Sequence, residues 1–282
     1  MNILTKRFLI ILIFSLFANY NVNSQDIFDL QHSIKYANYL FSTKQYKLAT
    51  EELERVVFMD SSNLSYKIKL LRAYRMGGFY ESGIKRAIEF SNGETYRLQK
   101  NLAVEYLTML LLYGANKDID NFLSKNNTLS EKDKTLINWS NQIVEGNYKK
   151  ASEIISKFDA NKKKVPKEVF MITREGLDHH FKSPFLAGSL STVIPGLGKV
   201  YTKNYVDGIF AFAFIAGTAW QAYKGFDKKG IKSINGWIFG GLSLGFYLGN
   251  IYGSVKSAKK YNKFKRDETK YKVFDFIQSY DF

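Results

Sequence analysis

Hydrophobic and polar positions divide the chain into two stretches with different patterns. Over residues 26–161, apolar side chains recur at intervals of three and four, without a proline and among many Leu, Lys, Glu and Tyr. This pattern predicts amphipathic helices. After Lys182 the chain holds three runs without a charged residue, 183–198, 208–223 and 233–255. We therefore expect an all-α protein in which a polar helical domain is followed by an apolar helical bundle.

The polar stretch repeats with a period of 34 residues. Tyr46 and Tyr80 stand 34 positions apart, and a third copy lies at residues 146–151. In each copy a bulky residue precedes a small one by three positions, which suits a second helix that crosses the first closely. The distance from Ala49 to Ala151 is three periods, so one more unit is expected between residues 102 and 122.

These residues resemble the tetratricopeptide-repeat family, which implies antiparallel helix pairs stacked into a solenoid with a concave face. Two features depart from the family: Ser61 stands where its usual proline ends the first unit, and the first helices lack its aromatic-Leu-Gly signature. Such repeats bind other proteins through polar residues on the concave side. The candidates for protein binding are Lys69, Arg72 and Arg75.

The beginning of the chain has the pattern of a secretory signal peptide. Lys6 and Arg7 precede an apolar run over residues 8–18, and the polar end of the segment predicts cleavage before Gln25. An uncleaved anchor helix is the alternative. Either interpretation predicts that the repeat domain is exported. The expected boundaries are a signal peptide at 1–24, a repeat domain at 25–161, a charged connector at 162–182, a transmembrane domain at 183–255 and a basic tail at 256–282.

Small residues predict how the apolar helices pack. Glycines spaced by four lie on one helix face and let a neighbouring backbone approach closely. A row of alanines on the middle run offers the matching face of an antiparallel hairpin. The predicted packing residues are Gly241, Gly245, Gly249, Gly253, Ala213, Ala216 and Ala219. Asn250 is expected to form a hydrogen bond across this hairpin or at a subunit contact. Alternatively, the glycine face forms a homo-oligomer or lines a pore.

The number of membrane crossings follows from the lengths of the apolar runs. The run 233–255 is long enough to cross a hydrocarbon core of about 30 Å, whereas the first two runs are shorter. The first contains Pro195 and is either a broken span or a re-entrant hairpin. Lysines and arginines beside membrane spans are more frequent on the cytoplasmic side. Their distribution beside the apolar runs favours three crossings and a cytoplasmic tail, and two crossings remain the alternative.

Several apolar segments together resemble a little-characterised bacterial integral-membrane family with a Pro-Gly-x-Gly-Gln-x-Tyr-x-Gly core and a Gly-Asn-Ile-Tyr-Gly motif. Members of that family are often associated with the membrane-protein-insertion efficiency factor family. The resemblance implies a membrane location. Its motif residues here are Pro195, Gly196, Gly198, Tyr201, Asp207, Gly208, Asn250 and Tyr252. Lys199 and Lys203 replace the Gln and the turn Gly of the family pattern.

Composition limits the chemistry. The absence of cysteine excludes disulfides and thiol chemistry, and His179 and His180 in the connector are expected to be solvated rather than to bind a metal. The net charge of +15 is compatible with nucleic acid, but export argues against that partner. Most of the basic excess flanks the apolar runs, which favours contact with anionic lipid head groups.

The pattern shows no nucleophile with a base, no phosphate loop and no metal cluster, so we expect neither catalysis nor a cofactor. The expected function is a non-enzymatic scaffold of the bacterial inner membrane, with a periplasmic repeat domain that binds an unidentified protein. The alternative is a small transport or membrane-protein-insertion accessory that acts through the glycine-rich bundle.

Overall fold

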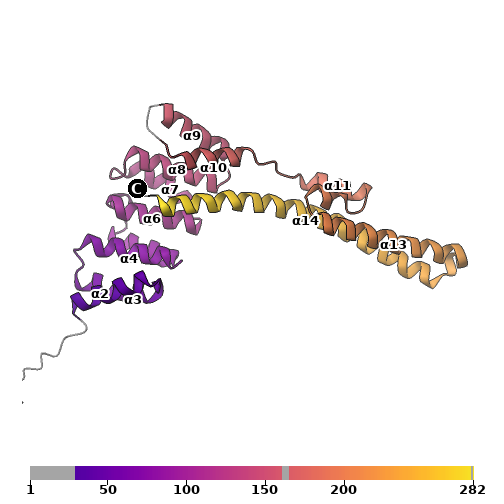
Figure 1. Cartoon of the computed structure of the whole chain (residues 1–282), viewed down its shortest axis with the longest axis horizontal. Coiled ribbons are helices and arrows are strands. Elements are labelled where there is room, and N and C mark those ends of the chain that lie inside the picture. The colour runs from indigo at the N-terminus through magenta and orange to yellow at the C-terminus, as the bar shows by residue number, and fades with distance from the viewer. Residues whose placement is uncertain (1–28, 161–164, 281) are drawn as a thin grey trace, which may run out of the picture. The chain divides into compact units, whose positions relative to one another are not determined.

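A computed structural model describes residues 29–160, 165–280 and 282, and every regular element within these ranges is helical (Figure 1). The all-α class is therefore confirmed for these residues. The predicted signal peptide at 1–24 lies outside them. The chain divides into two compact units, which meet in the sequence between Phe79 and Tyr80.

The described residues of the first unit form three helices with one small core. They are α2 (Leu30–Ser42), α3 (Tyr46–Met59) and α4 (Leu64–Met76). Helix α3 contacts both of the others, and its Ala49, Leu53 and Val56 are buried. The Asp29 carboxylate accepts a hydrogen bond from the backbone N–H of His32, 2.7 Å away, which satisfies a free donor at the start of α2.

The second unit contains ten α-helices and two short 3-10 helices among its described residues. They are α5 (Tyr80–Phe90), η1 (Thr95–Arg97), α6 (Lys100–Tyr113), α7 (Lys117–Lys125), α8 (Glu131–Val144), α9 (Tyr148–Ala160), α10 (Lys167–Leu177), α11 (Pro184–Val193), α12 (Leu197–Tyr201), α13 (Tyr205–Lys229), η2 (Gly230–Lys232) and α14 (Ile234–Ser279).

Helix boundaries follow the 34-residue spacing of the sequence. Tyr46, Tyr80 and Tyr148 are the first residues of α3, α5 and α9, and α6 with α7 lies where the additional unit was expected. Helix α6 contacts α5, α7, α8 and α14, so most of its circumference is buried. A helix buried on several sides is apolar all round, which explains why its sequence fits the repeat pattern only loosely.

The predicted solvated connector is wrong in its second half. Residues 167–177 form α10, which packs on α9 and α14 with Val169 fully buried. The indole N–H of Trp139 donates to the hydroxyl of Thr173 across 2.8 Å, and both side chains are buried. The buried residues of α10 are Val169, Ile172, Thr173 and Gly176, which lie on one face of the helix. This spacing was visible in the sequence, but the many charged residues around it favoured a solvated segment.

The predicted basic tail is helical over most of its length. Residues 256–279 continue α14 without interruption, so that this helix runs from α13 back to α6, α8 and α10 (Figure 1). Phe276 packs edge-on against Trp139 with ring centroids 5.6 Å apart, and Val273 is fully buried. The second half of α14 is therefore part of the packed core of the second unit, together with α8 and α10.

Helices α13 and α14 form an antiparallel hairpin whose packing faces differ from the predicted ones. A Cβ atom added at Gly241, Gly245 or Gly249 would meet no other atom within 4 Å. The three alanines Ala213, Ala216 and Ala219 are exposed. These six positions therefore do not form the predicted intramolecular contact.

The hairpin is closed by a different stripe of small residues. A Cβ atom added at Gly225 would lie 2.7 Å from the backbone nitrogen of Gly236, so the two backbones touch near the tip. Further along, Ala222 lies against Gly240, and the hydroxyl of Ser243 donates to the carbonyl of Ile215. Small side chains allow this close approach. On α14 they are Gly236, Gly240 and Ser243, spaced by four and then three residues, whereas the predicted row was spaced by four throughout.

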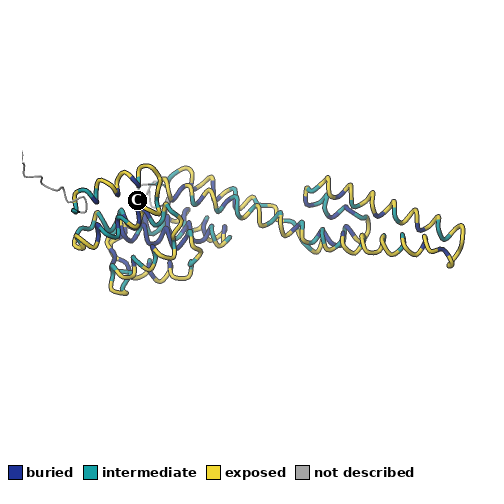
Figure 2. The backbone as a smooth tube through the Cα atoms, turned by 90° about the horizontal axis from the view of Figure 1, so that it is seen from below, coloured by how far each residue is buried: buried dark blue, intermediate teal, exposed yellow. Residues whose placement is uncertain are grey.

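The hairpin is mostly exposed, as the yellow tube at the right of Figure 2 shows. Many of its exposed side chains are large and apolar. By length and mean hydropathy, none of the helices within the described ranges qualifies as a membrane span.

Candidate functional site

The residues of the membrane-family motif gather at the base of the hairpin, where α11, α12, α13 and α14 meet. Gly196 precedes α12 with φ of 86°, a conformation that favours glycine. A Cβ atom added there would lie 2.1 Å from the carbonyl oxygen of Gly208 in α13. These two motif glycines therefore bring the starts of α12 and α13 into backbone contact. Pro195 is half-buried in the turn before them.

Gly198 brings α12 against α11 in the same way. A Cβ atom there would lie 1.8 Å from the carbonyl oxygen of Ala187. Its N–H donates to the hydroxyl of Ser191, which in turn donates to the hydroxyl of Ser254 across 2.7 Å. Ser254 donates to the carbonyl oxygen of Asn250. This buried chain of hydrogen bonds fixes α11 and α12 on α14.

Two further contacts join the base of the hairpin to the preceding segment. The side chain of Asn262 accepts from the N–H of Lys182 and donates to its carbonyl oxygen, at 2.7 and 2.8 Å. The hydroxyl of Tyr201 accepts from the N–H of Ser183, and the Lys182 ammonium lies 4.5 Å from the Tyr201 ring centre. The motif residue Tyr252 is instead exposed.

Lys203, in the turn between α12 and α13, has φ of 63°. The left-handed conformation is unfavourable for a residue with a Cβ atom. The turn is held by Thr202, whose hydroxyl donates to the carbonyl of Lys199 and accepts from Ser257 across 2.6 Å. The backbone at Lys203 is therefore strained.

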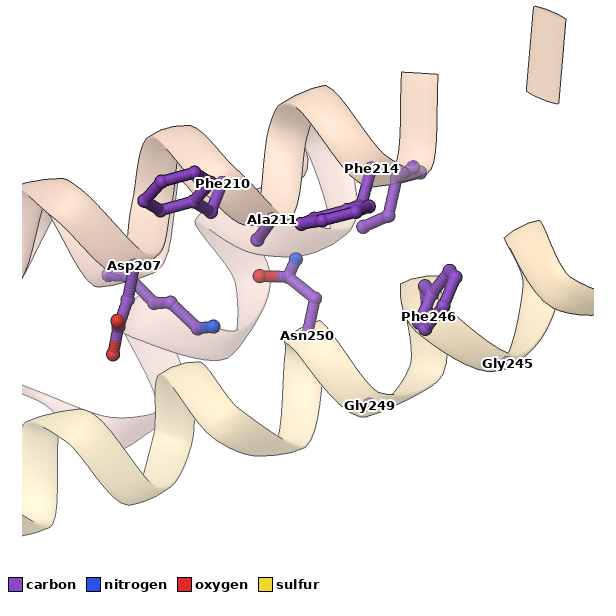
Figure 3. Close-up of a pocket in the computed structure, with 10 residues that line it drawn as sticks. Asp207, Phe210, Ala211, Phe214, Gly245, Phe246, Gly249 and Asn250 are labelled. Carbon is purple, nitrogen blue, oxygen red and sulfur yellow. The ribbon is translucent and has the colours of Figure 1, made fainter. Parts of the chain in front are cut away.

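A cavity of about 420 Å³ opens beside this base, between α13 and α14 (Figure 3). Its walls are largely apolar, and its polar groups are a cation, a carboxylate and an amide. The lining residues are Lys199, Asp207, Phe210, Ala211, Phe214, Ile215, Gly245, Phe246, Gly249 and Asn250. The volume lies in the range of small-molecule sites.

Asn250 points from α14 toward α13 in this cavity, with its amide facing Ala211 (Figure 3). The residue is only 4% exposed, and within the described ranges neither its amide nitrogen nor its amide oxygen has a hydrogen-bond partner. The predicted hydrogen bond from Asn250 across the hairpin is therefore not formed between α14 and α13. The apolar neighbours Ala211 and Ile215 offer it no partner.

Lys199 and Asp207 are the charged groups of the cavity. The stem of Lys199 passes over Gly253, where a Cβ atom would lie 3.4 Å from its Cε. In the part of the chain that the structure describes, no carboxylate pairs with the Lys199 ammonium. The Asp207 carboxylate accepts from the side-chain amide of Asn204 across 2.7 Å.

The three predicted protein-binding residues lie on α4 in the first unit. Lys69 donates to the side chain of Asn38 and lies 5.5 Å from the ring centre of Phe41. Burial lowers the pKa of the Lys69 ammonium, and the charge of Arg72 lowers it further. Arg72 is exposed and Arg75 is half-buried. These three residues therefore form a basic surface on one helix.

The predicted solvation of the histidine doublet is right for His180, which is exposed, and wrong for His179. The His179 ring hydrogen-bonds the hydroxyl of Thr269 and lies edge-on to Tyr148 with centroids 5.6 Å apart. Burial lowers the pKa of His179, and Lys265 adds to that effect. No cluster of metal-ligating side chains occurs within the described ranges.

Comparison with protein-family models, curated proteins and solved structures finds no match for this chain.

Sequence reasoning missed the polar residues that organise the site. Ser191, Ser254 and Ser257 are isolated hydroxyls in or beside apolar runs, and each bonds another helix or turn. Small polar residues in an apolar helix commonly form such interhelical bonds, so their positions were a usable signal.

Proposed function

We propose that this protein is a non-enzymatic scaffold of the bacterial cell envelope, anchored in the inner membrane by the α13–α14 hairpin. In this proposal the repeat helices bind another protein in the periplasm. The observation that carries the proposal is the distribution of exposed apolar side chains on the hairpin.

Large apolar side chains cover the outside of most of α13 and of the first half of α14. The exposed ones are Val206, Ile209, Phe210, Phe212, Phe214, Trp220, Tyr223, Ile234, Trp237, Ile238, Leu242, Leu244, Phe246, Leu248 and Tyr252. A monomeric soluble protein rarely exposes a contiguous apolar patch of this kind. Lipid acyl chains would cover this surface without leaving a polar group unpaired, because backbone bonds are satisfied within each helix.

Amphipathic aromatic residues bound this surface at both ends. Tyr205 and Tyr252 are exposed at the base, and Trp220 and Tyr223 are exposed near the tip. Tyrosine and tryptophan favour the two interfaces of a bilayer. The 18 residues from 206 to 223 rise about 27 Å as a helix, which is close to the thickness of the hydrocarbon core.

In this proposal, the contacts of α14 determine which helices lie on the same side of the membrane as the two ends of the hairpin. Because its C-terminal half packs on α8 and α10, both ends of the hairpin would lie on the same side of the membrane as these two helices. Helix α11 is 10 residues long and α12 only five, so neither reaches across. The hairpin would therefore enter and leave from the periplasmic side, with the lysines of its tip directed toward the cytoplasm.

Flotation with lipid vesicles tests the anchor. Phe212 lies in the first half of α13, within the uncharged run 208–223, and is 51% exposed. Phe212→Asp would therefore place a carboxylate among acyl chains at a cost of about 2.5–3.5 kcal/mol. We expect the wild-type chain to float and this variant to float much less. Tyr113→Asp, at a residue of α6 with 54% exposure, is the matched control and should float normally.

Equal flotation of Phe212→Asp and the wild-type chain would contradict the anchor. Protein binding is tested separately, by crosslinking in native membranes. A chain with Lys69, Arg72 and Arg75 replaced by alanine should lose crosslinked partners and still float. Unchanged crosslinks would remove these three residues from the proposed binding surface.

A further inference from the structure

We propose that the cavity between α12, α13 and α14 binds one anionic phospholipid whose head group carries a hydroxyl, of the phosphatidylglycerol type. This inference rests on the membrane anchor proposed above. The proposed anchor contacts many bilayer lipids through its outer surface. This inference adds one specific lipid, bound in the cavity at the base of the hairpin.

The amide of Asn250 requires a ligand with two kinds of polar group. Its nitrogen can donate two hydrogen bonds and its oxygen can accept two, yet both atoms are buried and have no partner among the residues that the structure describes. Buried polar groups are almost always hydrogen-bonded in folded proteins. A ligand that completes Asn250 must therefore offer both an acceptor and a donor. A phosphate oxygen and a neighbouring hydroxyl meet both requirements.

The charges at the cavity favour a ligand with a single negative charge. Lys199 lines the cavity, and its ammonium has no carboxylate partner among the described residues. Its stem passes close to Gly253, where a Cβ atom would lie 3.4 Å from Cε. A lysine binds phosphate as a point charge. Asp207 lies at the same cavity and would repel a second negative charge. A phosphate diester, with one negative charge, suits this pair better than a phosphate monoester with two.

The walls of the cavity favour an apolar chain beyond the phosphate. Phe210, Phe214 and Phe246 line it beyond the polar groups, over a floor formed by Gly245 and Gly249. The glycines are open to this space, since a Cβ atom at either would meet nothing within 4 Å. An acyl chain can lie in this groove while its head group remains beside Lys199. A small soluble phosphate would leave the aromatic walls uncovered.

The arrangement also agrees with the depth expected from the anchor. Lys199, Asp207 and Asn250 lie at the base of the hairpin, next to the exposed Tyr205 and Tyr252. This is the level at which lipid head groups lie in the proposed anchor. The phenylalanines lie further toward the tip, where acyl chains would be.

Native mass spectrometry of the full chain in detergent tests the proposal. Phosphatidylglycerol, phosphatidylcholine and phosphatidic acid are added separately, and the bound fraction is measured over a range of lipid concentrations. We expect one phosphatidylglycerol per chain, bound about tenfold more tightly than either other lipid. Equal binding of the three lipids would overturn the assignment.

Variants connect the binding to the two polar residues. Lys199→Gln removes the charge at similar length and should weaken phosphatidylglycerol binding about tenfold, whereas Lys199→Arg should retain most of it. Asn250→Leu removes the unpaired amide, so it should keep the fold and lose the lipid. Lys256→Gln alters an exposed lysine near the same end of the hairpin and should bind as the wild-type chain does. Wild-type affinity in Lys199→Gln and Asn250→Leu would overturn the proposal.

Two further measurements distinguish this lipid from a soluble phosphate and from a second copy of the chain. Glycerol 3-phosphate, added without lipid, should not bind; tight binding of this soluble probe would show that the ligand is a free phosphate and overturn the lipid. A dimer that excludes added lipid would assign the cavity to a second copy of the chain and would also overturn it.

Flotation separates a failure of this inference from a failure of the anchor. If the protein floats with phosphatidylcholine vesicles but shows no lipid preference in the mass spectra, the lipid site is wrong and the anchor stands. If the protein does not float with any vesicle, the anchor is wrong, and the lipid site fails with it.

Discussion

The repeat helices and the hairpin bury opposite kinds of residue. In the repeat helices the core consists of large apolar side chains, with Trp139, Leu107 and Ile119 almost completely buried. In the hairpin helices the buried positions include Gly208, Ala222, Gly236, Asn250 and Ser254. Most large apolar side chains of the hairpin are exposed instead, although Ile215 of α13 is buried. The tube of the hairpin in Figure 2 is accordingly mostly in the colour of exposed residues.

The three tryptophans of the chain show this difference most clearly. Trp139 is 0% exposed, whereas Trp220 and Trp237 are 58% and 65% exposed. Burial of apolar area is the dominant favourable contribution to folding in water, so the repeat helices are organised for an aqueous exterior. Close packing of small residues with apolar groups outside is the arrangement expected where the exterior is itself apolar. One chain therefore follows two packing rules.

Matched tryptophan substitutions give the largest test of this difference. Trp139→Ala removes a buried indole together with its hydrogen bond to Thr173 and its contact with Phe276. We expect it to lower the free energy of unfolding by about 3–5 kcal/mol, because it creates a cavity. Trp220→Ala, on the exposed face, should change it by less than about 0.5 kcal/mol.

Both values can be measured by urea unfolding in mild detergent, with near-UV circular dichroism as the signal. Comparable losses in the two variants would mean that Trp220 is buried against protein, in a second copy of the chain. In that case the contrast between the two regions would disappear.

A second test compares two glycines of the apolar bundle. Gly198→Ala places a methyl group 1.8 Å from the carbonyl oxygen of Ala187, so the backbone must move. We expect a loss of about 1–3 kcal/mol, as for overpacked cores. Gly241→Ala adds a methyl group in open space on a helix and should be neutral or stabilise by up to about 1 kcal/mol.

Thermal unfolding of the two glycine variants in detergent measures this difference. If Gly241→Ala destabilised the protein as strongly as Gly198→Ala, the glycine row of α14 would form a contact after all. An accompanying change in oligomeric state would assign that contact to another copy of the chain.

A third test concerns strain at the base of the hairpin. Lys203→Gly replaces a residue at φ of 63° with one that adopts this conformation freely. We expect a stabilisation of about 0.5–1 kcal/mol, because the relief of strain exceeds the added flexibility of the unfolded chain. A rise in thermal midpoint relative to the wild-type chain checks it, with Lys256→Gly expected to lower the midpoint, since glycine is unfavourable within a helix.

The repeat helices were predictable from the sequence because their periodicity depends on local packing. Tyr46, Tyr80 and Tyr148 begin helices at the predicted spacing. The failures arose where distant contacts decide the structure. Helix α10 and the second half of α14 are rich in charge, yet Val169 and Val273 are fully buried against other helices.

The motif at the base of the hairpin was predicted as a set of residues, but its geometry was not. Gly196, Gly198 and Gly208 are required where backbones touch, and only the fold shows which backbones those are. The glycine row at 241–249 was assigned to the wrong face. A spacing of four identifies a row of small residues, but the side that faces the partner helix depends on crossing angle and register.

The smallest expected effect concerns pH at the contact between α14 and the repeat helices. His179 lies against Thr269 and Tyr148, and the charged groups around it are Glu175 of α10 with Lys265, Glu268 and Lys272 of α14. Burial, followed by Lys265, lowers the pKa of His179 below its ordinary value of 6.5. As pH falls below about 6.5, the unfolded chain therefore takes up a proton that the folded chain resists.

The neutral His179 side chain therefore contributes its full share of the free energy of unfolding above pH 6.5. This contribution is lost as the pH falls toward the lower pKa that His179 has in the folded chain. Glu268 has a lowered pKa through its hydrogen bond to Lys265, but its contribution is lost only below its own ordinary value of 4.5. Urea unfolding midpoints measured at pH 7.5 and pH 5.5 separate the contribution of His179 from that of Glu268, since only His179 of these two residues titrates near this interval. We expect the wild-type chain and His180→Gln to lose stability over this interval and His179→Gln to lose less. An equal pH dependence in His179→Gln would show that this histidine does not couple protonation to the contact between α10 and α14.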